Sequence, residues 1–220
     1  MQNNIISFCK NKNINSFEEL LNKLQTKTTL WIEFINIITI NETYFFREKN
    51  QIIKALIKHN KTTSPLNILC APSSTGEEVY SIVILIIEMK ITNFKVTGID
   101  ISTEAIKKAK IGIYNERSVH KISPNILNKY FHISNNKYKV KDLLKKYTNF
   151  IECNLFEDKI YHIGKFDLIF SRNMFIYFKD EIKIKAYKRI SALKKDTYSN
   201  IYLGHADVSS KLQNYIRMKK

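Results

Sequence analysis

Leu66-Asn-Ile-Leu-Cys-Ala-Pro-Ser-Ser-Thr-Gly-Glu-Glu-Val-Tyr-Ser81, followed by Phe94-Lys-Val-Thr-Gly-Ile-Asp100, is the stretch that decides the fold. It predicts a buried strand, a tight turn, a helix and a second buried strand that ends in a carboxylate. In such a unit the turn lies close to a bound nucleoside, and the carboxylate binds the ribose hydroxyls. Asp100 is therefore the candidate ribose ligand. The alternative is an α/β unit whose acids only cap helices and add solubility.

The turn after the first strand is unlike a phosphate-binding loop. The chain has only five glycines, and none forms Gly-x-Gly. A pyrophosphate cofactor is thus disfavoured, because cradling phosphate requires several glycines. Ser74 and Glu77 have capping-box spacing, which predicts a structural Glu77 and leaves Glu78 to meet a cation. A ligand with a ribose, a positive charge and no phosphate fits S-adenosylmethionine.

The rest of the chain alternates between predicted strands and helices. Further strands are expected at 150–153, 166–170 and 200–205, and further helices at 16–24, 29–40, 51–58, 103–110 and 180–193. This order predicts an α/β fold with a mostly parallel sheet covered on both faces. Asn135-Asn136 lies between two short alternating runs, which predicts a hairpin within residues 130–148.

Composition limits the possible locations and partners. The net charge of +16 favours an anionic partner such as nucleic acid or an acidic protein, unless it only reflects a lysine-rich background. No run of 18 uncharged apolar residues predicts a membrane span, and the N-terminus does not resemble a signal peptide, so a cytoplasmic protein is expected. The three cysteines are far apart and have no metal-binding spacing, so no metal is expected.

Five motifs in order resemble the CheR-type chemotaxis receptor methyltransferases. They are Asn-x-Thr-x-Phe-Phe-Arg-Glu at 41–48, Ser-Thr-Gly-Glu-Glu-x-Tyr-Ser at 74–81, Asp100 with the segment 104–114, Arg-Asn-x-x-Ile-Tyr-Phe at 172–178 and Leu-Gly-His at 203–205. The resemblance implies a Rossmann-like S-adenosylmethionine-dependent methyltransferase domain over 43–220. It also implies a shortened N-terminal helical segment over 1–42 and a small β-hairpin insertion at about 130–148.

The resemblance also implies a role for each site residue. Arg47 would pair with the carboxylate of the methyl donor, with Asn41 and Thr43 beside it, and Glu78 would face the donor's amino group. Asp100 would hold the ribose, while Asn154 and Leu155 would border the adenine. Arg172, Asn173 and Tyr177 would line the methyl-transfer end, with Arg172 and Tyr177 orienting the acceptor.

Several of these residues also have a plain structural explanation. Asn41 and Thr43 suit a helix cap, Arg47 suits a surface ion pair and Tyr177 suits the core. Asp100 could cap the next helix, although Ser102 is better placed to do so. His205 follows a strand and is interpreted as a core histidine, so it is left out of the site.

The family methylates receptor glutamates and releases S-adenosylhomocysteine, which makes the cytoplasmic signalling domain of chemoreceptors the expected partner. The hairpin is short, so no C-terminal docking peptide of the receptor is expected to be needed. Two rival functions stay open. A nucleic-acid methyltransferase would suit the charge, but the Pro-Pro-Tyr-like segment of amino-methylating enzymes is absent, which makes a nucleic-acid substrate unlikely. The other rival is a non-catalytic donor-binding regulator.

Overall fold

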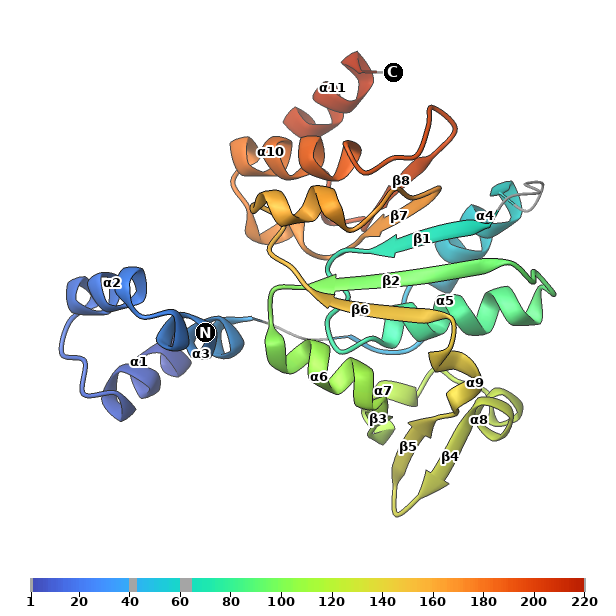
Figure 1. Ribbon diagram of the computed structural model, residues 1–220, viewed down its shortest axis with the longest axis horizontal. Coiled ribbons are helices and arrows are strands. Elements are labelled where there is room, and N and C mark those ends of the chain that lie inside the picture. The colour runs from blue at the N-terminus through green and yellow to red at the C-terminus, as the bar shows by residue number, and fades with distance from the viewer. Residues whose placement is uncertain (1, 40–42, 60–64, 220) are drawn as a thin grey trace.

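The computed structural model describes residues 2–39, 43–59 and 65–219. Its centre is a five-stranded parallel sheet with the order β6-β2-β1-β7-β8 (Figure 1). The strands are β1 (Leu66–Cys70), β2 (Phe94–Asp100), β6 (Thr148–Glu152), β7 (Leu168–Ser171) and β8 (Asn200–Leu203). The chain runs from β1 outward to β2 and β6, and then to the other side with β7 and β8. In sheets of this kind ligands bind outside the carboxyl ends of the strands, at the point where the order reverses.

Side chains alternate along each strand, so apolar side chains point to both faces of the sheet, and helices cover both faces. In β1, Ile68 and Cys70 belong to the cluster that contains α4 and α5, while Leu69 belongs to the cluster with α10 and α11. These helices are α4 (Lys49–His59), α5 (Glu77–Glu88), α10 (Asp180–Ser191) and α11 (Ser210–Met218). The apolar run of α5 is buried from Val79 to Ile86, which explains why this helix carries few charges.

A second, antiparallel sheet has the order β3-β5-β4 and consists of β3 (Ile113–Tyr114), β5 (Lys137–Val140) and β4 (Phe131–Ser134). It lies with α7 (Glu116–Val119), α8 (Pro124–Tyr130) and α9 (Asp142–Lys145), below α6 (Thr103–Ile111) in Figure 1. Asn135 and Asn136 form the β4–β5 turn with φ of 48° and 56°, as a two-residue hairpin of this twist requires. The predicted hairpin is confirmed.

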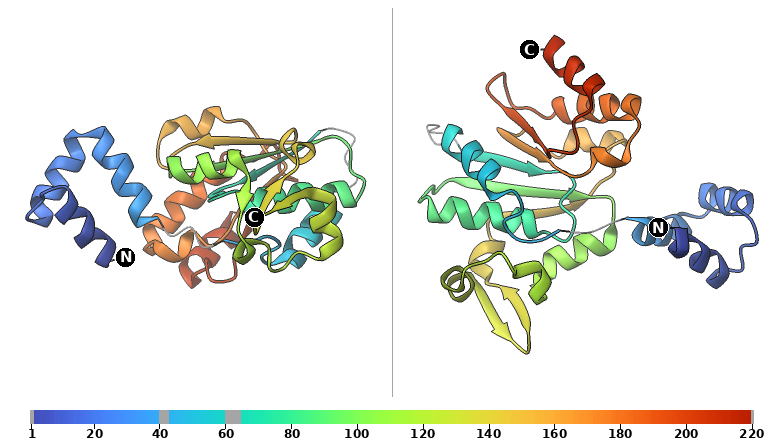
Figure 2. Two further views of the ribbon diagram at one scale, coloured as in Figure 1. Left: turned by 90° about the horizontal axis from the view of Figure 1, so that it is seen from below. Right: turned by 180° about the vertical axis from the view of Figure 1, so that it is seen from behind.

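Three N-terminal helices stand to one side of the sheet (Figures 1 and 2). They are α1 (Gln2–Asn11), α2 (Phe17–Thr26) and α3 (Thr28–Ile38), and they share a small core of their own. The contact with the main body runs from α3 to α6, where Asn36 accepts a 2.8 Å hydrogen bond from the Ser102 hydroxyl and donates one of 3.1 Å to Thr103. Across the described ranges, no helix has both the length and the apolarity that a bilayer crossing requires.

Candidate active site at the carboxyl edge of the sheet

Asp100 fastens the turn after β1 to the end of β2. Its Oδ2 accepts a 2.8 Å hydrogen bond from the Ser74 amide, and its Oδ1 accepts one of 2.9 Å from the Ser102 amide. Burial raises the pKa of the Asp100 carboxyl, and the two amide hydrogen bonds oppose that rise. Ser102 caps α6 with its hydroxyl, which accepts from the Ala105 amide at 3.1 Å. The helix-capping duty therefore falls on Ser102, and Asp100 lies at the edge where a ribose ligand is expected.

The turn lies very close to β2. A Cβ placed on Gly98 would be 2.8 Å from Ser73 Cβ and 2.9 Å from a ring carbon of Phe150, so the approach requires glycine at this position. Beside it, the buried Ser73 Oγ has no hydrogen-bond partner among the described residues. A buried hydroxyl without a partner is costly. An unpaired polar atom in the first turn, together with the carboxylate of Asp100, fits a nucleoside ligand.

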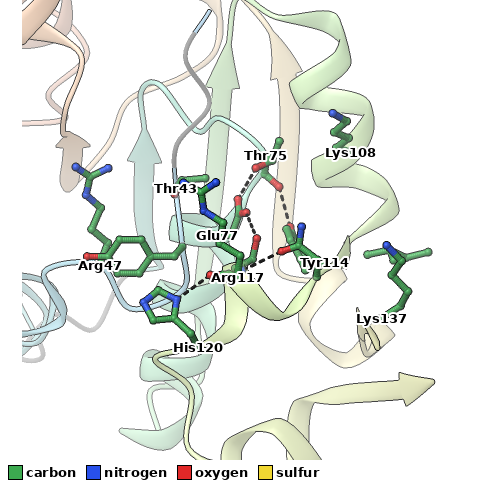
Figure 3. Close-up of a pocket in the computed structure, with 13 residues that line it drawn as sticks. Thr43, Arg47, Thr75, Glu77, Lys108, Tyr114, Arg117, His120 and Lys137 are labelled. Carbon is green, nitrogen blue, oxygen red and sulfur yellow. Dashed lines mark hydrogen bonds between the residues drawn. The ribbon is translucent and has the colours of Figure 1, made fainter. Parts of the chain in front are cut away.

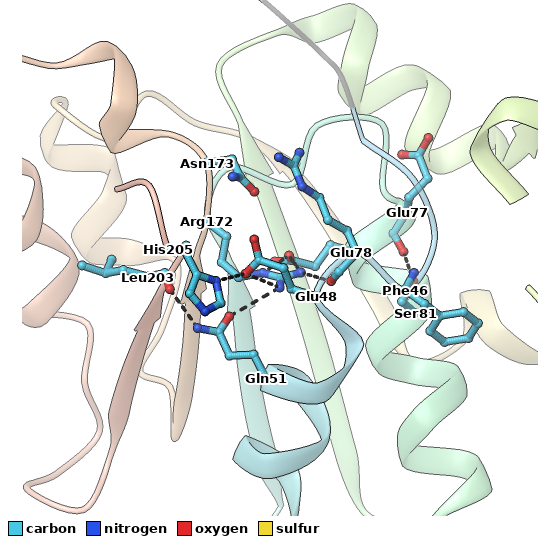
Figure 4. Close-up of polar contacts among 12 residues, drawn as sticks. Phe46, Glu48, Gln51, Glu77, Glu78, Ser81, Arg172, Asn173, Leu203 and His205 are labelled. Atoms are coloured by element: carbon cyan, nitrogen blue, oxygen red, sulfur yellow. Dashed lines mark hydrogen bonds and ion pairs between the residues drawn. The ribbon is translucent and has the colours of Figure 1, made fainter. Parts of the chain in front are cut away.

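Arg172 leaves the end of β7 and joins the segments that carry the motifs. Its side chain is 2% exposed. Nε donates to Glu78 Oε2 at 2.5 Å, Nη2 also pairs with Glu78, and Nη2 donates to the carbonyl of Arg47 at 2.8 Å. Nη1 lies 3.5 Å from Glu48 Oε2 and 3.4 Å from Gln51 Oε1. A buried guanidinium with this set of acceptors holds the 47–51 segment against α5 and the sheet (Figure 4).

Glu48 and Gln51 extend this network to β8. Gln51 donates to the Leu203 carbonyl at 2.9 Å, and His205 Nδ1 lies 3.3 Å from Glu48 Oε2. The expected core position of His205 is wrong, because its side chain is 84% exposed. The residue follows the end of β8, beyond the covered part of the sheet. In the sequence, the one indication of a role for Glu48 was its position next to Arg47 at the end of the first motif.

Asp207 is a second buried centre that sequence reasoning missed. Its Oδ2 accepts from the Asn173 amide at 2.6 Å and the Gly204 amide at 2.8 Å, and its Oδ1 accepts from the Ile176 amide at 3.2 Å. These hydrogen bonds tie the loop after β7 to the loop after β8. Asn173 has φ of 61°, a strained value for a non-glycine residue, which this carboxylate holds in place.

The predicted capping box of Ser74 and Glu77 is wrong. Gly76, with φ of 95°, is the N-cap of α5, and no side chain caps it. Glu77 instead turns back, where its carboxylate accepts from Thr75 Oγ1 at 2.6 Å and from Ser118 Oγ at 3.1 Å. The helix starts two residues later than the capping box predicted, because Ser74 adopts φ of 47° to bring its amide to Asp100.

The other predicted site residues are spread along the same edge. Asn154 and Leu155 follow β6, and the backbone amide of Cys153 donates to the Asp100 carbonyl at 2.9 Å, which brings this loop beside Asp100. Asn154 holds its own loop by accepting from the Phe156 amide at 3.0 Å. Tyr177, in the short helix η2 (Phe175–Tyr177), is 54% exposed and so is not a core residue. Asn41 lies outside the described residues.

A groove of about 660 Å³ lies on the other side of the turn (Figure 3). Thr43 and Arg47 line it, together with Thr75 and Glu77, whereas Asp100, Asn154 and Arg172 do not. The groove is thus a second candidate for the donor-binding site. The chemistry of the carboxyl edge is the better guide, because it has the unpaired hydroxyl and the buried carboxylate. Arg47 belongs to both places, because its carbonyl accepts from Arg172 and the residue is also part of the groove lining. Within the described ranges, no three His, Cys, Asp or Glu residues gather into a metal site.

Comparisons with a family model and with individual proteins all indicate the same protein family. Residues 41–220 match the model described as CheR methyltransferase, SAM binding domain. A chemotaxis protein methyltransferase of Campylobacter jejuni is 37% identical over 91% of this chain and 77% of that protein. A chemotaxis protein methyltransferase of Borreliella burgdorferi is 35% identical over 94% of this chain and 79% of that protein. One from Escherichia coli is 29% identical over 99% of this chain and 79% of that protein.

Proposed function

Because the chain belongs to the CheR methyltransferase family and uses S-adenosylmethionine as its cofactor, we propose that it methylates glutamate side chains in the cytoplasmic signalling domain of chemotaxis receptors. The products are a glutamate methyl ester and S-adenosylhomocysteine. One observation carries the proposal: residues from four separate motifs, Arg47, Glu78, Asp100 and Arg172, meet along the carboxyl edge of one sheet.

Donor binding is assigned to the residues of that edge. Asp100 takes the ribose hydroxyls with lone pairs left beside its two amide hydrogen bonds. Asn154 and Leu155 border the adenine, and Ser73 Oγ gains a partner in the bound state. Asn41, Thr43, Arg47 and Asn173 complete the donor site, with the Arg47 guanidinium suited to the donor carboxylate by its planar fork. Glu78 faces the donor's amino group, and Arg172 holds the Glu78 carboxylate in place.

The acceptor requires little activation by the protein. A glutamate carboxylate has an unperturbed pKa of about 4.3 and is ionised at neutral pH, so no general base is needed. The bound donor supplies a methyl group on a sulfonium, and transfer to the carboxylate oxygen breaks the carbon–sulfur bond and leaves a neutral thioether. What remains for the protein is alignment of the two reactants and exclusion of water.

Arg172 and Tyr177 divide the work at the methyl-transfer end. The Arg172 guanidinium is surrounded by Glu78, Glu48 and the Arg47 carbonyl, so we assign it a positioning role rather than contact with the acceptor. Tyr177 is exposed beside the same loop, where its hydroxyl is available to a protein substrate. Tyr177 is therefore the residue that orients the acceptor carboxylate.

Asp100→Ala is expected to weaken S-adenosylmethionine binding by about 1–3 kcal/mol, roughly 5- to 150-fold, because a charge-assisted hydrogen bond to the ribose is lost. Calorimetric titration measures the change. Ser102→Ala is the matched control, since it removes the α6 cap but leaves the carboxylate in place, and it should bind the donor normally. Wild-type affinity in a folded Asp100→Ala variant would remove the ribose assignment.

Tyr177→Phe is expected to lower turnover while donor affinity stays within about tenfold, or roughly 1.4 kcal/mol. The reason is that the hydroxyl faces the protein substrate and not the donor. Steady-state kinetics and donor titration on the same preparation separate the two effects. Unchanged turnover would mean that the hydroxyl is idle and that only the ring matters.

The proposed activity is tested with radiolabelled donor and a receptor signalling fragment. We expect label on glutamate that is released as methanol by mild base, which is the behaviour of a methyl ester. A receptor without its C-terminal tail should be methylated nearly as well, because we propose direct recognition of the methylated region without a docking peptide. Base-stable label, or transfer to nucleic acid instead, would contradict the proposal. A large loss on tail removal would contradict only the mode of recognition.

A further inference from the structure

The groove beside the first turn has walls from segments that are far apart in the sequence (Figure 3). The 43–47 segment and the turn at Thr75 form one side, the end of α6 and the start of α7 form another, and the β4–β5 hairpin contributes Lys137. The small antiparallel sheet therefore meets the catalytic domain at this groove. None of the roles assigned above uses the residues from α6, α7 or the hairpin.

The lining of the groove is strongly cationic. It includes Lys108, Arg117 and Lys137, with Arg47 and His120 also among the lining residues. The acidic member of the lining is Glu77, and its carboxylate already accepts from Thr75 and Ser118. Burial raises the pKa of the Glu77 carboxyl, while its hydrogen bonds and the charge of Lys108 act in the opposite direction. The groove therefore favours an anionic occupant, and Tyr44 and Ile113 add apolar contact surface.

Arg47 connects this groove to the methyl-transfer site. The residue is part of the groove lining, and its carbonyl accepts from the Arg172 guanidinium at 2.8 Å. A protein substrate whose acceptor glutamate lies at the carboxyl edge would thus extend into the groove. The cations come from separate elements, which suits several separate carboxylates along a chain better than one compact anion.

We propose that this groove binds acidic side chains that flank the methylated glutamate in the protein substrate, and so selects which glutamates are methylated. This inference rests on the proposed function. A protein segment that presents glutamate for methylation is itself anionic, and its neighbouring carboxylates would pair with Lys108 and Lys137. The groove is a recognition site and takes no part in the chemical step.

The test uses a double variant, Lys108→Gln with Lys137→Glu. Lys108 is neutralised rather than reversed because its charge also acts on the buried Glu77. Both side chains are exposed, so the fold should tolerate the changes. Lys110→Gln with Lys139→Glu is the matched control: it has the same change in net charge, on the same helix and strand, at exposed residues that do not line the groove.

Two measurements are made with a receptor signalling fragment, its equilibrium binding and the kcat/KM for its methylation. A single exposed charge pair changes binding by only about 1.5- to 5-fold, so the double change is expected to lower both quantities roughly tenfold at low salt. The control should lose less than about twofold. The loss should shrink at high salt because the screening length falls below about 8 Å, and S-adenosylmethionine affinity should be unchanged in both variants.

A charge swap in the substrate gives the sharpest result. A fragment whose acidic residues next to the acceptor are changed to Lys should bind wild-type protein poorly and the groove variant better. Equal losses of fragment binding in the groove and control variants would mean that only net charge matters. Loss of S-adenosylmethionine binding in the groove variant would mean that the groove belongs to the donor site. Either result overturns the inference, as does unchanged binding. Binding is scored without methylation, so an inactive wild type would contradict the proposed function alone.

Discussion

Arg172→Met is expected to destabilise the protein by about 3–5 kcal/mol, the loss seen when one member of a buried ion pair is removed. The substitution leaves the carboxylates of Glu78 and Glu48 without their shared counter-charge, and it removes the hydrogen bond that ties the Arg47 carbonyl to the end of β7. Donor binding should fall with it, since Arg172 holds both the Arg47 backbone and the Glu78 carboxylate in place. Urea unfolding followed by circular dichroism measures the free energy of unfolding.

The ion-pair explanation is checked by repeating the change in a Glu48→Gln/Glu78→Gln background. With both carboxylates replaced by neutral amides, Arg172→Met no longer leaves a buried charge without its partner, so the loss of stability should be clearly smaller. The difference between the two losses gives the coupling between the guanidinium and the carboxylates. An identical loss in both backgrounds would show that packing of the Arg172 side chain, rather than charge, is what the fold requires.

Asp207→Ala is expected to cost roughly 3 kcal/mol or more of the free energy of unfolding. The side chain is fully buried, and its removal leaves the amides of Asn173, Gly204 and Ile176 without an acceptor. Each unsatisfied buried donor costs about 1–3 kcal/mol, which applies to the buried Gly204 and the half-buried Asn173 more than to the exposed Ile176. The loop that carries Tyr177 should also loosen, so turnover should fall even at temperatures where the variant stays folded.

Asp196→Ala is the matched control for this change. Asp196 also accepts two backbone hydrogen bonds, from the amides of Tyr198 and Ser199, but its side chain is exposed. Water can replace the lost acceptor there, and the loss should be much smaller. Similar losses for the two aspartates would contradict the assignment of Asp207 as a buried centre.

The order of the elements could be predicted from the sequence because hydrophobic patterning and turn residues report on local structure. The strand pair ending at Asp100 is one example, and the Asn135-Asn136 hairpin is another. Asp100 ends one predicted strand and Arg172 follows another, and the two lie at one edge because the carboxyl ends of parallel strands share an edge.

What the sequence could not supply was long-range pairing. Glu48 and Arg172 are 124 residues apart, and nothing local in either segment reveals the partner. Asp207 lies outside any predicted motif, and its three backbone partners are set by how two loops meet. The capping-box prediction failed for a related reason, because the tertiary bond from Ser74 to Asp100 prevailed over the local preference.

The central claim is that the donor binds along the carboxyl ends of β1, β2 and β6. A crystal structure of the protein with S-adenosylhomocysteine tests it most directly. We expect the ribose hydroxyls within hydrogen-bond distance of the Asp100 carboxylate and the adenine beside Asn154 and Leu155. The carboxylate of the ligand should lie on the Arg47 guanidinium. A nucleoside bound instead in the groove lined by Lys108 and Lys137, with Asp100 untouched, would contradict the account.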